Sequence, residues 1–288
     1  GVVNYITRKP THEFSFDLST QVENNNGLRT NGAINLPISD SVKQRLAFST
    51  LSRDGYTKNE FTGNNIDGRE QLSVRSSTLI EFSDAFDAVL TVEYTKEDST
   101  RLGTAKMVCD PDPTYGCSDQ TSDQTNDPAD YGTGNVDNTL LSIGVLKPNR
   151  YADNANPADL RSVNFDLDPE FFGETTFSSL ELNYDLGDYT LTAVTGFHNA
   201  DTHARKDYDR AAAPNAFNVV PGITVDDGNG NGVLTYQQFD QYVSTTDYSP
   251  TSHTKRKSDQ YSQEIRLASS LDGPANFLTG VYWTVVDQ

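Results

Sequence analysis

The sequence predicts an all-β fold in which about nine antiparallel meander strands form part of a larger transmembrane β-barrel with long external loops. Two observations carry this prediction. Hydrophobic residues alternate with polar residues in runs of about ten, and short and long connections alternate between these runs. Alternation gives each strand one apolar and one polar face. Short turns at one end and long loops at the other are typical of outer-membrane barrels.

The alternating runs follow one another along most of the chain. They extend over Phe14 to Leu18, Ile34 to Ile38, Val42 to Phe48, Leu72 to Phe82, Ala88 to Tyr94, Leu180 to Leu186, Leu191 to Phe197, Ile265 to Leu267, and Phe277 to Val285. We expect neighbouring strands to pair in sequence order. We also expect five apolar side chains to face outward, namely Leu90, Val92, Leu180, Leu182 and Leu267.

The connections fall into two classes of length. Residues 37–41, 83–86, 185–188 and 271–274 form short links, whereas residues 53–69, 99–174 and 199–258 form long ones. Loops as long as 99–174 and 199–258 are usually functional or disordered. We therefore expect external loops at these two places to carry function.

The composition excludes several other classes of protein. Only 35 % of the residues are hydrophobic, and the mean hydropathy is -0.60, which is low for a soluble globular protein. The 14 Tyr and 14 Phe are too many for a disordered chain. A net charge of -19 argues against a nucleic-acid partner. No apolar run approaches the roughly 18 residues that a transmembrane helix needs.

Both ends of the sequence lie inside strand-like patterns. The chain starts at Gly1 in one such run and ends at Gln288 in another. Nine strands are also an odd number, whereas single-chain bacterial barrels have an even number of strands. We therefore expect the chain to be a fragment of a longer protein.

Three stretches resemble the TonB-dependent outer-membrane receptor family. The opening GVVNYITRKP (residues 1–10) resembles the last plug strand and its exit into the barrel. Residues 53–56 followed by residues 65–70 resemble the link between early barrel strands. The stretch QYSQEIRLAS (residues 260–269) resembles a barrel strand of the family, with residues 277–283 as its return partner. The resemblance implies that residues 1–11 end the plug domain and that residues 12–288 form the N-terminal portion of the barrel.

The resemblance also implies a function. Members of the family take up scarce solutes through the bacterial outer membrane, most often iron-siderophore complexes, with energy from the TonB complex. The expected partners are that complex, a small solute and outer-membrane lipid. Two alternatives remain. A passive porin does not account for the opening motif, and a soluble calcium-binding adhesin or lectin does not account for the alternating connection lengths.

One glycine-rich stretch has the spacing of an EF-hand calcium loop. Its candidate ligands are Asp227, Asn229, Asn231, the carbonyl of Val233, and Gln238, with Asp240 as an alternative ligand. Gln238 stands where a bidentate Glu is usual, so we expect weak calcium binding. The alternative is a glycine-rich surface turn. We expect no other cofactor.

Cys109 and Cys117 are the only cysteines, and both fall in the first long loop. An even pair outside the cell usually forms a disulfide. A zinc site is the alternative, but no His lies nearby. We therefore predict a Cys109–Cys117 disulfide.

Basic residues and histidines gather in and beside the second long loop. The basic residues are Arg205, Lys206, Arg210, Lys255, Arg256 and Lys257. They could receive an anionic siderophore or bind lipopolysaccharide phosphates, or they could simply balance nearby Asp residues. His198, His203 and His253 could hold a metal or an iron chelate, or stand alone at the surface.

No catalytic motif is present in the sequence. The nucleophile elbow, the zinc-peptidase motif and the phosphate-binding glycine loop are all absent from it. We therefore do not expect an enzyme.

Overall fold

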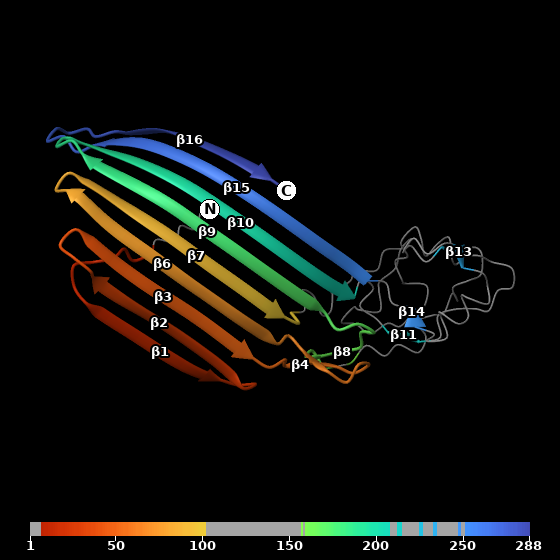
Figure 1. Ribbon diagram of the computed structural model, residues 1–288. Helices are drawn as coiled ribbons and strands as arrows, with labels where there is room; N and C mark the ends of the chain where they lie inside the picture. Colours follow the sequence, from red (N-terminus) through yellow and green to blue (C-terminus); the bar gives the residue numbers. More distant parts are fainter. Residues whose placement is uncertain are drawn as a thin grey trace.

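The computed structural model describes residues 7–101, 157, 159–207, 212–214, 225–226, 233–234, 247–248 and 251–288. Within these residues, nine long strands form one antiparallel sheet in which neighbours follow the order of the chain (Figure 1). The strands are β1 (Ser15–Glu23), β2 (Gly27–Pro37), β3 (Val42–Arg53), β6 (Arg69–Ser83), β7 (Phe86–Ser99), β9 (Glu170–Asp185), β10 (Tyr189–Asp207), β15 (Thr251–Ser269) and β16 (Leu278–Asp287). The predicted antiparallel meander is confirmed. No helix among these residues could cross a membrane.

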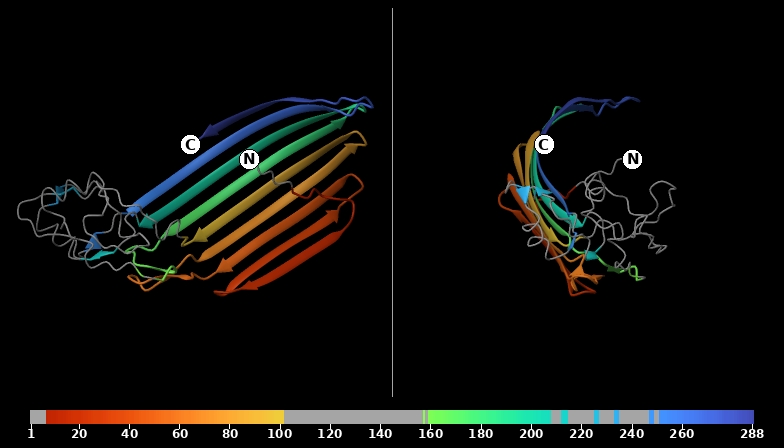
Figure 2. Two further views of the ribbon diagram at one scale, coloured as in Figure 1. Left: turned by 180° about the vertical axis from the view of Figure 1, so that it is seen from behind. Right: turned by 90° about the vertical axis from the view of Figure 1, so that its right-hand side faces the viewer.

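The sheet is curved, with one concave and one convex face (Figure 2). The segment that precedes β1 lies on the concave side, where Lys9 contacts Glu181 of β9. Successive side chains on a strand point to opposite faces, and cross-strand partners share a face. Leu180 and Leu182 therefore lie on the convex face, together with Leu90, the partner of Leu180.

The strand register extends this assignment to the other predicted residues. Val92 is two positions from Leu90 on β7. Leu267 pairs with Leu191, which in turn pairs with Tyr184 on the Leu182 side of β9. All five residues that were expected to face outward therefore lie on the convex face, as predicted.

Two rows of aromatic rings border the apolar part of the convex face. Near the short turns, Phe82 stacks on Phe86 with ring centroids 5.0 Å apart, and Phe86 lies 5.9 Å from Tyr184. Toward the loops, the rings of Tyr261 and Trp283 are 5.5 Å apart. Large apolar side chains between these rows are exposed, including Leu90 at 46 %. An exposed apolar belt of this size indicates a surface that contacts something other than water.

Gly32 allows one aromatic ring to lie flat on this face. It pairs with Phe48 of the neighbouring strand, and a Cβ on Gly32 would lie 2.3 Å from the Cε1 atom of that ring. A larger residue at position 32 would therefore displace the Phe48 ring.

Three strands are much longer than the alternation predicted. β9 begins at Glu170, β10 runs to Asp207 and β15 begins at Thr251. The connections are accordingly shorter at their ends than the predicted loops 99–174 and 199–258. The reason is chemical. Beyond the second aromatic row polar side chains occur on both faces, so hydrophobic alternation stops although the backbone pairing continues.

A second, smaller sheet joins two segments that are distant in the sequence. Its strands are β4 (Thr57–Asn59), β5 (Asn65–Ile66) and β8 (Ser162–Val163), in the order β5-β4-β8, with β4 and β8 parallel. Ile66, Val163 and Phe165 form its core, each 1 % exposed. Two-residue ladders also pair β11 (Ala213–Pro214) with β14 (Asp247–Tyr248), and β12 (Val225–Asp226) with β13 (Val233–Leu234).

Asp168 organises the polar part of this small unit. Its carboxylate accepts hydrogen bonds from Asn59 Nδ2 at 2.8 Å, Thr62 Oγ1 at 2.8 Å and Asn64 Nδ2 at 2.5 Å. Asn59 is fully buried, and its Oδ1 accepts the backbone N–H of Phe165 at 3.1 Å. Buried polar groups are stable only when bonded in this way. The network therefore fixes the link after β3 to the segment before β9.

Candidate functional site

One cross-strand row crosses six strands near their loop ends. It runs through Arg53, Arg69, Ser99, Phe171, Ala204 and Thr254, each paired with the next. We call this set the rim row. Phe171 has the same parity on β9 as Glu181, which faces Lys9. The side chains of the rim row therefore lie on the concave face.

Basic side chains gather along the rim row. Arg53 and Arg69 are direct cross-strand partners, an arrangement that like charges normally disfavour. Arg69 Nε and Arg101 NH1 lie 3.6 Å and 3.5 Å from the same oxygen of Glu97. Arg53 NH2 donates to the backbone carbonyl of Asp67 at 3.1 Å. Lys206 lies two positions beyond Ala204, on the same face. The rim of the concave face is thus rich in cations although the chain carries a net charge of -19.

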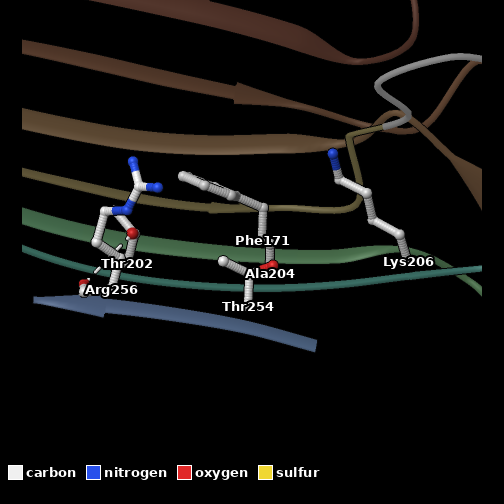
Figure 3. A pocket seen from close by; sticks show the side chains of 6 residues that line it. All are labelled: Phe171, Thr202, Ala204, Lys206, Thr254 and Arg256. Atoms are coloured by element: carbon white, nitrogen blue, oxygen red, sulfur yellow. Dashed lines mark hydrogen bonds between the residues drawn. The ribbon is translucent and has the colours of Figure 1, made fainter. Parts of the chain in front are cut away.

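A hollow lies beside the rim row on β9, β10 and β15. Its volume is about 270 Å³, and it is lined by Phe171, Thr202, Ala204, Lys206, Thr254 and Arg256. Figure 3 shows Phe171, Lys206 and Arg256 rising from the same side of the sheet. The guanidinium of Arg101 lies 3.3 Å from the centre of the Phe171 ring. Cations, hydroxyls and an aromatic ring together can hold an anion that carries a planar or apolar group.

The strand register divides the basic set that the sequence singled out. Lys206 and Arg256 lie on the concave face, in the hollow. Arg205, Lys255 and Lys257 have the opposite parity and lie on the convex face. There Arg205 pairs with Glu170, and Lys257 Nζ lies 3.3 Å from Asp201 Oδ2. Arg210 lies outside the described residues.

Sequence reasoning missed four residues of the rim as candidates, namely Arg53, Arg69, Arg101 and Phe171. Parity could have found most of them. Counted along a strand from its apolar positions, every second residue lies on the polar face. On β9, for example, Phe171 falls on the face opposite to Leu180.

His198 and His203 lie on opposite faces of the sheet. His198 has concave parity and pairs with Gln260, whereas His203 has convex parity and pairs with Lys255. His253 lies in β15 opposite Arg205. No group of three or more His, Cys, Asp or Glu residues that could hold a metal occurs in the part of the chain that the structure describes.

The predicted disulfide and most of the predicted calcium loop lie outside the described residues. This holds for Cys109, Cys117, Asp227, Asn229, Asn231, Gln238 and Asp240. Val233 is described and lies in β13, where it pairs with Asp226 of β12. The two short strands therefore stand on either side of residues 227–232 in the sequence. Both sites stay predictions.

The segment before β1 is fixed to the concave face by three strands. Asn35 of β2 is fully buried. It accepts the Thr11 N–H at 3.0 Å and donates to the Thr11 carbonyl at 2.9 Å. Lys9 Nζ lies 2.6 Å from Glu181 Oε1 of β9, and His12 Nε2 lies 3.2 Å from Glu81 Oε1 of β6. The chain therefore reaches β1 along the inside of the curved sheet.

The fold matches a segment of the β-barrels of two solved uptake receptors. Over 97 % of its length the chain matches the ferric yersiniabactin uptake receptor from Yersinia pestis, with a TM-score of 0.59, 12 % sequence identity and 32 % of that chain covered. It also matches the ferric-catecholate import receptor from E. coli K12 in its open form, with a TM-score of 0.58, 13 % identity, and 97 % and 35 % of the two chains covered.

The chain spans about a third of the length of these receptors, as the covered shares of 32 % and 35 % show. At 12 to 13 % identity, the likeness concerns the fold alone. No protein-family model matches the chain, and no curated protein matches it.

Proposed function

We propose that the chain is part of a bacterial outer-membrane receptor that takes up a scarce, anionic solute by TonB-dependent active transport. The solute class that we propose is an iron-siderophore complex. The observation that carries the proposal is the rim row. On and beside this row, five basic residues gather on the concave side of a strongly acidic chain, namely Arg53, Arg69, Arg101, Lys206 and Arg256. Such a concentration attracts anions and fixes them by charge-assisted hydrogen bonds.

The convex face supports a location in the outer membrane. Outer-membrane barrels carry an apolar band about 25 Å tall between two girdles of aromatic residues. The belt around Leu90, between the rings at Phe86 and at Tyr261, has this composition. The convex face would contact lipid, and the concave face would line the lumen.

The fixed segment before β1 supports an active receptor over a passive porin. Its contacts with Asn35 and Glu181 hold the segment that contains Lys9 and Thr11 against the concave face, and this supports a segment that leads from a plug domain into the barrel. A porin has no use for such a segment. Two receptors in the comparison are named for ferric yersiniabactin and for ferric catecholates, and these names support an iron complex as the solute.

Growth of a deletion strain tests the proposal. The strain and its complemented control are grown on a panel of single iron sources and on a panel of glycans. We expect loss of growth on one class of ferric siderophore, with growth on every glycan retained. Unchanged growth on all iron sources, together with loss on a glycan, would show that the solute is not an iron complex.

A second experiment tests the site. The deletion strain is complemented with the full-length receptor carrying both Lys206→Gln and Arg256→Gln. We expect growth to need a higher concentration of the same iron source. Wild-type growth with this variant would exclude the rim hollow as the capture site.

A further inference from the structure

A second hollow on the concave face lies between the N-terminal segment and the wall of the sheet. Its volume is about 320 Å³, and its lining includes Arg8, Lys9, Arg75, Val89, Phe177 and Glu181. We call it the deep pocket. Phe177 and Glu181 lie farther along β9 than Phe171, toward the short turn that follows Asp185. The deep pocket is therefore farther from the loops than the rim hollow.

The charges of the deep pocket do not cancel. Lys9 Nζ pairs with Glu181 at 2.6 Å. Arg75 donates to Glu93 Oε2 through Nε at 2.9 Å and through NH2 at 2.5 Å. Arg8 makes no ion pair with any residue that the structure describes, and it is exposed to the hollow. One positive charge is thus available to an anion.

The deep pocket repeats the chemistry of the rim hollow. Each combines an inward phenylalanine of β9, Phe171 or Phe177, with basic side chains from neighbouring segments. Six residues along a strand correspond to about 20 Å. A third hollow lies beside Phe177 and is also lined by His198, the cross-strand partner of Phe177, and by Gln260. The deep pocket and the third hollow therefore share Phe177, and both lie farther from the loops than the rim hollow.

We propose that the deep pocket is a second binding site for aromatic anions, occupied after the rim hollow. The order of occupation rests on the proposed function, because uptake runs from the loops toward the turns. The ligand's ring packs on Phe177 and Val89, and its acidic group accepts hydrogen bonds from Arg8. The volume is at the lower end of ligand pockets, about 300 to 1,000 Å³. It fits an aromatic carboxylate or one aromatic arm of a larger chelate.

The deep pocket depends on the position of the segment that contributes Arg8 and Lys9. Both residues lie in the segment before β1, and the other lining residues named above belong to the sheet. The pocket exists only while this segment stays bound to the sheet, where Lys9 contacts Glu181 and Thr11 contacts Asn35. An anion held by Arg8 would be released when the segment is pulled away from the wall.

The test uses 4-bromobenzoate as the probe on the intact receptor in detergent. Crystals soaked with the probe locate bromine by anomalous scattering, and calorimetry gives the affinities. We expect two bromine sites, one beside Phe171 and one beside Phe177. Arg8→Gln should weaken the deep site by about tenfold or more, the scale of one charge-assisted hydrogen bond, and leave the rim site unchanged.

Two further variants complete the design. Phe177→Leu keeps an apolar side chain but removes the ring, and it should also weaken the deep site. Arg45→Gln is the matched control. Arg45 lies on the same face, its guanidinium is 4.0 Å from Asp17, and it does not line the pocket. The variant therefore removes a guanidinium without changing the pocket itself. This variant should retain both sites.

The outcomes separate the inference from the proposed function. Bromine at the rim alone, or a deep site unaffected by Arg8→Gln, would overturn the deep pocket and leave the proposed function standing. Bromine in the deep pocket with none at the rim would support the deep pocket and count against the rim as the capture site.

Discussion

The three strands β9, β10 and β15 differ between their turn ends and their loop ends in the polarity of the side chains on the convex face. On the turn side of Tyr261, apolar side chains occupy most of the convex face and polar side chains most of the concave face. On the loop side of Tyr261, charged and polar side chains occur on both faces, with Lys257 and Asp201 paired on the convex side, and no alternating apolar row continues. The hydrogen-bonded register nevertheless continues without a break to the pair Asp207 and Thr251. Hydrophobic alternation thus indicates that the two faces of a strand have different surroundings. It does not indicate how far along the strand the hydrogen-bonded pairing extends.

The largest expected effect is a loss of barrel stability when a charge is placed in the apolar belt of the convex face. Leu90→Arg places a charge in the middle of the convex belt. In a bilayer this should destabilise the folded barrel by about 2 to 4 kcal/mol. Urea unfolding of the intact receptor in lipid vesicles measures the change.

The matched control for this variant lies on the same strand. Thr95→Arg puts the same side chain on the concave face of β7, the face on which Arg75 of the neighbouring strand β6 lies. It should change the unfolding free energy much less. Equal losses for Leu90→Arg and Thr95→Arg would contradict the assignment of the two faces.

A smaller effect is expected in the external sheet of β4, β5 and β8. Asp168→Ala leaves the buried amide of Asn59 without its acceptor, which costs about 1 to 3 kcal/mol. Amide hydrogen exchange should accelerate by about tenfold or more in residues 57–66 and 162–165, and barrel stability should stay constant. Asn64→Ala removes only one exposed donor and should have a weaker effect. No change in exchange would mean that this network does not hold the unit together.

The third prediction compares basic residues near the rim row that lie on the concave face with basic residues that lie on the convex face. Lys206→Gln and Arg256→Gln should each weaken binding of the transported solute by about tenfold, because each removes one charge-assisted contact. Lys255→Gln and Lys257→Gln remove the same charges from the convex face and should leave affinity unchanged. Titration of the four variants of the purified receptor measures this. Equal losses in all four would favour a diffuse electrostatic effect over a concave site.

The smallest expected effect concerns the predicted calcium loop. Extracellular calcium sites bind with dissociation constants of about 10⁻⁴ to 10⁻³ M, and Gln238 supplies only a neutral ligand. Calorimetry with millimolar calcium should give heat for the wild-type receptor and none for Asp227→Ala. If the two titrations are alike, the segment is only a glycine-rich turn.

The fold could be predicted where one face of a strand is apolar and the other is polar. The alternation around Leu90 and Leu180 placed β7 and β9 and assigned their outward faces. It failed for the ends of β10 and β15, because His203 and Lys255 are as polar as their neighbours on the other face. It also failed for β4, β5 and β8, since strands of two or three residues are too short to show a period.

The candidate site could be predicted only in part. A local run of charge drew attention to Lys206 and Arg256, but also to Arg205, Lys255 and Lys257 on the other face. Arg53, Arg69 and Phe171 are far apart in the sequence. Only the cross-strand register brings them into one row.

The long pairing of β10 with β15 has a practical consequence for engineering the receptor. The two strands stay hydrogen-bonded up to Asp207 and Thr251, so the chain between these residues starts and ends at neighbouring points, about 5 Å apart. Lengthening a loop whose ends are already held together costs little, roughly 0.6 kcal/mol for each doubling. If the proposed function is right, a reporter peptide or a small folded domain inserted between Asp207 and Thr251 should therefore be displayed outside the cell without disturbing the sheet that carries it.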